Sequence, residues 1–112
     1  MKDLTDKIIA FRDDRNWKQF HNPKDEALSL VLEATEVLEH FQWRNGEEMT
    51  EHAKHKKDDI GEELADVFYW VLLMCHDLDI DLVEATRKKI EKNAEKYPIE
   101  KAKDKHLKYT EL

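Results

Sequence analysis

The sequence predicts an all-α protein. Its 112 residues include only two Gly and two Pro, whereas sandwiches and barrels need many turns rich in these residues. Apolar residues recur at three- and four-residue intervals, and no segment shows the alternation of a strand. At this length one domain is expected. We predict a four-helix bundle over residues 1–98, with residues 99–112 as a C-terminal tail of the same unit.

The N-terminal segment predicts a short amphipathic helix and a loop. Residues 3–14 place Leu4, Ile8 and Phe11 at helical spacing. Residues 15–22 are polar, carry two large aromatic side chains and lack strand alternation, so they are predicted to form a loop. Aromatic side chains in a loop need either a burial site or a ligand.

The second helix has a clear start signal. Asn22 can accept a hydrogen bond from an otherwise unpaired amide, and Pro23 suits the first helical turn. We expect this helix to cover residues 23–43, with the Asn-Gly pair at 45–46 as its stop. Residues 47–57 lack the apolar stripe of a core helix and are predicted to be a solvated connector or a frayed helical edge.

Two further helices are predicted. Residues 58–78 form the most apolar segment and are expected to be the central helix. Asp81 followed by Glu84 resembles a capping box and starts the fourth helix, which the Tyr-Pro pair at 97–98 ends. The Lys-rich tail, residues 99–112, is weakly patterned and is expected to be extended or ordered only against a partner.

Composition excludes several classes of function. The chain has 19 Lys and Arg against 26 Asp and Glu, for a net charge of −7, which repels nucleic acid. A single cysteine, Cys75, cannot form an intrachain disulfide and suits a reducing compartment as a buried, inert thiol. The longest apolar run, residues 67–75, is about half of the ~18 residues that a membrane span needs. We therefore predict a soluble, cytoplasmic protein with no nucleic-acid or membrane partner.

Two pairs of acidic residues lie where a helix should be apolar. Glu33 and Glu36 share one line of the second helix, and Glu63 and Asp66 share one line of the third, each flanked by apolar residues. Burying unpaired carboxylates costs several kcal/mol each. Neither line carries a Lys or Arg between its acids, so a bound metal ion is the compensation that we predict.

The chemistry of the four acids indicates which metal. Carboxylates without clustered Cys or His favour Mg²⁺ or Mn²⁺ over Zn²⁺. Di-iron bundles use Glu-x-x-His motifs, which neither pair contains, so iron is less favoured. Mg²⁺ in such a site usually keeps open positions for substrate phosphates, which points to phosphoryl chemistry. An alternative is that the acids only solvate helix faces.

The two acidic pairs, with 26 residues between them, resemble the signature of the MazG-like, all-α nucleoside triphosphate pyrophosphohydrolases. Further segments narrow the resemblance to the dCTP pyrophosphatase branch and extend it over nearly the whole chain: Arg15-Asn16-Trp17-Lys18-Gln19-Phe20-His21, Phe41-Gln42-Trp43, Glu62-Glu63-Leu64-Ala65-Asp66-Val67, Lys89 with Asn93, Tyr97-Pro98 and Lys108-Tyr109-Thr110-Glu111-Leu112.

The resemblance implies an activity and a set of site residues. A Mg²⁺-dependent member would hydrolyse a nucleoside triphosphate, here dCTP or a modified dCTP, to the monophosphate and pyrophosphate, and would be a homo-oligomer, typically a tetramer. By position, the metal ligands are Glu33, Glu36, Glu63 and Asp66. The residues around the base are Trp17, His21 and Trp43, and those that contact phosphate or sugar are Lys89 and Asn93.

The sequence is compatible with two functions, one catalytic and one not. In the first, metal-assisted hydrolysis occurs at the α-phosphorus, with Glu36 as the acceptor of the proton from water. In the second, the chain is a non-catalytic helical assembly module whose acids bind a structural cation or a basic partner. Oligomerisation suits both, because a thin four-helix chain with many aromatic residues leaves apolar surface for partners to cover.

Overall fold

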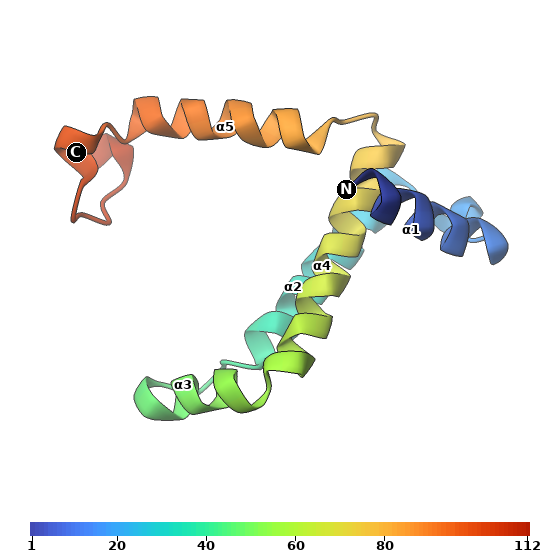
Figure 1. Cartoon of the computed structure of the whole chain (residues 1–112), viewed down its shortest axis with the longest axis horizontal. Coiled ribbons are helices and arrows are strands. Elements are labelled where there is room, and N and C mark those ends of the chain that lie inside the picture. Colours follow the sequence, from blue (N-terminus) through green and yellow to red (C-terminus); the bar gives the residue numbers. More distant parts are fainter. The chain divides into compact units, whose positions relative to one another are not determined.

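The computed structural model describes residues 1–112 and is entirely helical, which confirms the all-α prediction (Figure 1). Its contacts divide it into two compact units, Met1–Asp79 and Ile80–Leu112. The elements are α1 (Lys2–Asp14), a 3-10 helix (Lys18–Phe20), α2 (Pro23–Glu39), α3 (Gly46–His55), α4 (Lys57–Asp77), α5 (Leu82–Lys96), α6 (Ile99–Ala102) and a second 3-10 helix (Tyr109–Glu111).

The predicted helix starts are confirmed at two caps. The side chain of Asn22 accepts a hydrogen bond from the Asp25 amide at 2.9 Å, with Pro23 in the first turn of α2. Asp81 accepts one from the Glu84 amide at 3.1 Å at the start of α5. Both caps pair amides that the first helical turn leaves without a partner.

The structure has six α-helices rather than the predicted four, because the expected connector forms α3 and the tail contains the short α6. Gly46–His55 forms α3, with Asn45 as its N-cap residue in extended conformation. Acidic residues in the first turn of α3 and basic residues in its last turn suit the helix dipole, and α3 contacts α4. α2 also ends at Glu39 rather than at residue 43, because the chain turns and Trp43 adopts a left-handed φ of 68°.

The tail is ordered within the second unit, whereas the sequence predicts a tail that is extended or ordered only against a partner. It contains α6, and the ring of Tyr109 packs edge-on against Tyr97 with centroids 6.2 Å apart. The ammonium of Lys96 lies 4.9 Å from the centroid of the Tyr109 ring. The tail therefore folds onto the end of α5.

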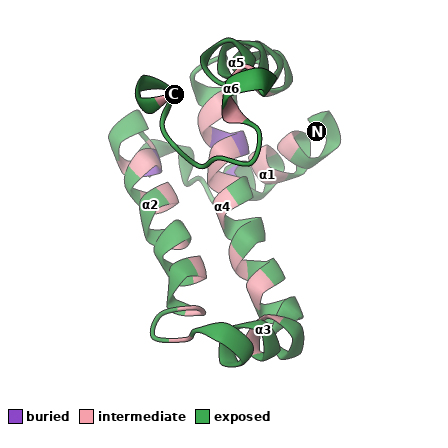
Figure 2. Cartoon of the chain, turned by 90° about the vertical axis from the view of Figure 1, so that its left-hand side faces the viewer, coloured by how far each residue is buried: buried purple, intermediate pink, exposed green.

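The core of the first unit is small. α2 and α4 run antiparallel side by side, and α1 packs against α4 (Figures 1 and 2). Leu72 and Leu73 are the only fully buried apolar residues. Cys75, expected to be buried, is half-buried, and burial raises the pKa of its thiol. No helix combines the length and the apolar character needed to traverse a bilayer.

An ion pair joins α1 to the end of α4. The guanidinium of Arg12, which is 1% exposed, donates to both oxygens of Asp77, at 2.7 and 2.9 Å. Burial opposes ionisation of Asp77, but the hydrogen bonds and the charge of Arg12, together with smaller contributions from Glu26 and His76, outweigh it and lower the pKa of this carboxyl. The pair is thus a charged contact at the edge of the core, with a buried guanidinium whose loss would be costly.

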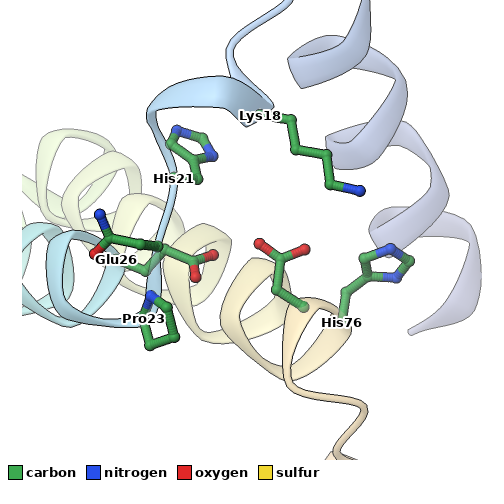
Figure 3. Close-up of a pocket in the computed structure, with 7 residues that line it drawn as sticks. Lys18, His21, Pro23, Glu26 and His76 are labelled. Atoms are coloured by element: carbon green, nitrogen blue, oxygen red, sulfur yellow. The ribbon is translucent and has the colours of Figure 1, made fainter.

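A buried carboxyl, that of Glu26, lies beside this pair. Glu26 is 1% exposed, and neither of its oxygens has a hydrogen-bond partner of good geometry. Figure 3 shows its carboxyl pointing into a cavity that His21 and His76 also line. Burial raises the pKa of Glu26 to about 7, and the neighbouring Asp77 adds to the shift. Glu26 therefore carries its proton over most of the acidic range.

The raised pKa of Glu26 predicts a fold that weakens with rising pH. The folded state holds this proton more tightly than the unfolded chain does, so the stabilisation is complete below about pH 4.5 and is lost as pH rises through about 7. We expect the free energy of unfolding to fall by on the order of 2–3 kcal/mol between pH 5 and pH 8.5. Urea unfolding followed by circular dichroism measures this.

Glu26→Gln tests the assignment, because glutamine mimics the protonated carboxyl at every pH. This variant should show a flatter pH dependence and exceed the wild type in stability at pH 8.5. Glu91→Gln, at an exposed site on α5, should keep the wild-type slope. If the free energy of unfolding of Glu26→Gln fell with pH as steeply as that of the wild type, a group other than Glu26 would be responsible for the pH dependence.

Candidate active site

The antiparallel pairing of α2 and α4 brings the two acidic pairs together. Glu33 and Glu36 come from α2, and Glu63 and Asp66 come from α4. One carboxylate oxygen from each residue lies within 4.8 Å of the others. Glu33 and Glu63 are half-buried, and Glu36 and Asp66 are exposed. We call these four residues the acidic quartet.

The acidic quartet lacks a compensating positive charge. None of the ion pairs in the structure includes one of its members. A hydrogen bond with Glu36, burial and the charges of the other members raise the pKa of Glu63 to about 7. Burial, followed by the charges of Glu36 and Asp66, raises the pKa of Glu33. Mutual repulsion of this kind is what a bound cation relieves.

The donor set fits a hard divalent cation. All four members offer carboxylate oxygens, the ligands that Mg²⁺ and Mn²⁺ prefer. No Cys or His belongs to the cluster, so the nitrogen and sulfur ligands of a typical zinc site are missing. The quartet could therefore hold a divalent metal ion between α2 and α4.

Metal binding predicts a thermal stabilisation. Because Mg²⁺ would relieve repulsion only in the folded state, Mg²⁺ at about 100 times its dissociation constant should add roughly 2.7 kcal/mol. For a domain of this size the melting temperature should rise by about 5 °C or more, and EDTA should reverse the rise. Differential scanning fluorimetry at constant ionic strength measures it. A double variant, Glu33→Gln with Glu63→Gln, should lose the response, and an unchanged response would contradict a quartet site.

An aromatic pocket adjoins the acidic quartet. The cavity, of about 370 Å³, is lined by Phe11, Trp17, His21, Asp66, Tyr69 and Trp70. The ring centroids of Phe11 and Trp17 lie 5.8 Å apart, and those of His21 and Trp70 lie 5.3 Å apart, both edge-on. Asp66 belongs to both the quartet and the pocket wall. A ligand could therefore place an aromatic ring in the pocket and a phosphate beside the quartet.

A model of the MazG-like family matches residues 28–112, which include the acidic quartet. The chain belongs to the MazG-like family. It is 32% identical over 114 residues to dCTP pyrophosphatase 1 of Homo sapiens and of Mus musculus, covering 100% of this chain and 67% of each relative. A pyrophosphatase from Archaeoglobus fulgidus, solved as a crystal structure, superposes with a TM-score of 0.84 at 40% identity, over 88% of this chain and 92% of that one.

The remaining predicted residues of this MazG-like chain lie outside the aromatic pocket. Trp43 is 87% exposed and follows α2, whereas Trp17 precedes it. The 17 residues of α2 span about 25 Å, so the two indoles do not face each other within one copy of the chain. Lys89 and Asn93 lie four residues apart on α5, in the second unit. Their role in binding stays a prediction.

Three basic side chains of the MazG-like chain, His40, Arg44 and His52, also lie next to the quartet. A second cavity of about 370 Å³ is lined by Glu36, Glu39, His40, Arg44, His52 and Glu63. Nδ1 of His40 and Nε2 of His52 are 3.0 Å apart. Burial lowers the pKa of His52, and the charges of Arg44 and His40 add to the shift. His40 and Arg44 lie in the turn after α2, and His52 lies in α3, within the residues 47–57 that the sequence predicts to be a solvated connector or a frayed helical edge.

Several residues around the aromatic pocket could not be predicted from the sequence. Phe11 is expected only as part of an apolar stripe, and the sequence indicates no role for Tyr69. Arg12 follows Ile8 by four residues, and Asp77 follows Leu73 by four, so each charged residue lies on an apolar line of its helix. That placement was a signal of a buried ion pair, but nothing in the sequence said that the two residues pair with each other.

Proposed function

We propose that this chain is a Mg²⁺-dependent nucleoside triphosphate diphosphatase that hydrolyses dCTP, or a modified dCTP, to the monophosphate and pyrophosphate. The observation that carries the proposal is the shared residue Asp66, which links four clustered carboxylates to an aromatic pocket. A nucleotide has the matching pair of features, a polyphosphate beside a flat base. The relatives named as dCTP pyrophosphatases and the neighbour named as a pyrophosphatase support the same reaction.

The quartet would hold the metal through Glu33, Glu36, Glu63 and Asp66. When bound, Mg²⁺ or Mn²⁺ would supply charge neutralisation on the phosphates and acidify water. Glu36, an exposed member of the quartet, accepts the proton as the oxygen of water bonds to the α-phosphorus. The bond from that phosphorus to the oxygen bridging to the β-phosphate breaks, and pyrophosphate leaves with the electron pair.

The aromatic pocket would hold the base. The indole of Trp17 and the ring of Trp70 offer faces and edges for stacking, and His21 offers a ring nitrogen to the edge of the base. Lys89 and Asn93 would contact phosphate or sugar. Trp43 would have to reach a base pocket from a second copy of the chain, because α2 separates it from Trp17 in the same copy.

A homo-oligomer, with a tetramer as the form that the family resemblance implies, is part of the proposal. Several apolar side chains of α2 are uncovered, with Val31, Leu32 and Leu38 exposed at 62%, 59% and 65%. Apolar surface of this kind usually marks an interface. Light scattering coupled to size exclusion should give about four times the 13.4 kDa mass of one chain, and Leu32→Glu should reduce it, whereas a mass of 13.4 kDa would contradict the oligomer.

Product analysis tests the reaction. Purified protein is incubated with Mg²⁺ and each deoxynucleoside triphosphate, and the products are resolved by anion exchange. We expect dCMP and pyrophosphate from dCTP. Release of orthophosphate would contradict hydrolysis at the α-phosphorus. No turnover with any nucleotide would favour the alternative, a non-catalytic helical module, and stoichiometric iron in the purified protein would favour a di-iron site.

A further inference from the structure

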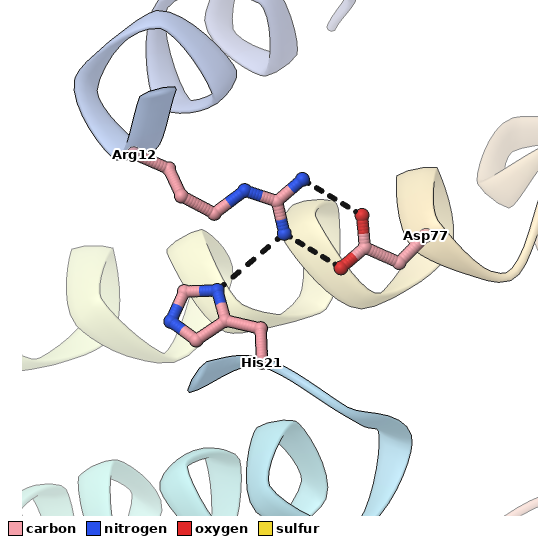
Figure 4. A network of polar contacts seen from close by, with 3 residues as sticks. All are labelled: Arg12, His21 and Asp77. Atoms are coloured by element: carbon pink, nitrogen blue, oxygen red, sulfur yellow. Dashed lines mark hydrogen bonds and ion pairs between the residues drawn. The ribbon is translucent and has the colours of Figure 1, made fainter. Parts of the chain in front are cut away.

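A hydrogen-bond network reaches the aromatic pocket from the core. Nη1 of Arg12 lies 3.4 Å from Nδ1 of His21, and the same guanidinium is held by both oxygens of Asp77 (Figure 4). His21 lines both the aromatic pocket and the cavity of Glu26. The three residues come from α1, from the loop before α2 and from the end of α4, so the network is a product of the tertiary fold.

The chemistry of Arg12 determines which nitrogen of His21 carries the proton. A guanidinium has only N–H donors and stays charged in proteins. The nitrogen that faces it must therefore be the unprotonated one, and in a neutral imidazole the proton then lies on Nε2. Figure 4 shows the second ring nitrogen on the side of the imidazole away from Arg12. His21 thus offers an N–H donor away from the ion pair.

Burial and hydrogen bonds fix the orientation of the Arg12 guanidinium. The guanidinium is 1% exposed, and two parallel hydrogen bonds to Asp77 fix its plane. Burial lowers the pKa of His21, and the charge of Arg12 lowers it further against the opposing effect of Asp77. The imidazole is therefore kept neutral at neutral pH, with one acceptor and one donor.

We propose that Arg12 is a positioning residue for base selection, which holds His21 as a neutral Nε2–H donor toward an unprotonated ring nitrogen of a pyrimidine. The inference rests on the proposed function, because it takes the aromatic pocket as the base site. Cytosine has an unprotonated N3, whereas uracil and thymine carry a hydrogen there. A fixed Nε2–H donor therefore favours cytosine. It disfavours uracil and thymine, because the N–H of the imidazole would face the N–H at position 3 of the base.

The first measurement needs neither a variant nor a substrate. Long-range ¹H–¹⁵N correlation spectra of histidine-labelled protein distinguish protonated from unprotonated ring nitrogens and give the titration midpoint of each ring. We expect His21 to show an unprotonated Nδ1 and a protonated Nε2 at pH 7, with a midpoint below that of an exposed histidine. A proton on Nδ1 at pH 7 would overturn the proposal.

The second measurement compares dCTP with dUTP, which differ at position 4 and in the proton on N3. Arg12→Met combined with Asp77→Leu removes both charges together, so no lone charge stays buried. We expect the ratio of kcat/KM for dCTP over dUTP to fall about tenfold, the loss of one good hydrogen bond. The change should lie mainly in KM for dCTP, with kcat little altered, and the midpoint of His21 should rise.

Two further variants make the outcome specific. His21→Gln, whose amide can present either a donor or an acceptor, should lower the dCTP/dUTP ratio of kcat/KM by the same factor. Adding His21→Gln to the double variant should not lower this ratio further. Arg87→Met, at an exposed arginine of α5, should leave the ratio unchanged. An unchanged dCTP/dUTP ratio in a folded double variant with a raised His21 midpoint would overturn the proposal. If the wild type hydrolyses no nucleotide, the proposed function fails, and the spectra still decide the state of His21.

Discussion

Glu63→Gln is expected to lower kcat/KM for dCTP by about 100-fold or more while the helical circular dichroism stays at its wild-type level. Mutating residues that only hydrogen-bond to metal ligands typically lowers metal affinity or activity 10- to 100-fold, and this variant removes a carboxylate of the quartet itself. Glu63 is also the quartet member whose pKa is raised to about 7, by its hydrogen bond with Glu36, by burial and by its acidic neighbours. Steady-state pyrophosphate release measures the loss.

The same substitution should not unfold the protein. Without metal, four carboxylates within 4.8 Å repel one another, so replacing one by a neutral amide keeps or increases the stability of the metal-free chain. Glu36→Ala should likewise abolish turnover with little change in helical content. Glu62→Gln is the matched control, because this neighbouring residue is exposed and lies outside the quartet. Equal losses in Glu62→Gln and Glu63→Gln would contradict a role specific to the quartet.

Arg12→Ala is expected to destabilise the protein by about 3–5 kcal/mol, the usual cost of removing one partner from a buried ion pair. The Asp77 side chain, 18% exposed, would lose both of its hydrogen bonds from Arg12. The protonated Glu26 beside it cannot supply a positive charge. Since small domains have only about 5–15 kcal/mol of total stability, this loss is a large fraction. Urea unfolding at pH 7 and a fixed protein concentration measures it.

The paired substitution separates charge from packing. Arg12→Met with Asp77→Leu replaces both charges by apolar side chains and should stay within about 1–2 kcal/mol of the wild type, or exceed it. Arg87→Ala, at an exposed site, should change stability by no more than about 0.5 kcal/mol. If Arg12→Ala were as stable as Arg87→Ala, the ion pair would contribute nothing to the fold.

Local chemistry made much of the fold predictable. The caps at Asn22 and Asp81 depend on residues three positions apart, and the apolar spacing of α4 depends on its own periodicity. α3 was missed for a related reason. Only Met49 and Ala53 among its ten residues have apolar side chains, and its order depends on contact with α4 and on charges that suit the helix dipole, which a search for apolar periodicity does not detect.

The candidate site, like the fold, could be predicted from the sequence only in part. Glu33, Glu36, Glu63 and Asp66 could be recognised because an i, i+3 pair of acids on an apolar line is costly without a cation, and each pair lies within one helix. Their meeting within 4.8 Å required the packing of α2 on α4.

The sequence alone therefore determined helix class, cap positions and the four candidate ligands, since these follow from residues within one or two turns of each other. Only the tertiary structure decided that Arg12 pairs with Asp77, 65 positions away, that His21 meets Arg12, and that Glu26 is buried beside Asp77. A charged residue on an apolar line of a helix predicts that it has a partner in the folded protein. Which partner each one finds is decided by how the helices pack, because only packing brings distant side chains within hydrogen-bond distance.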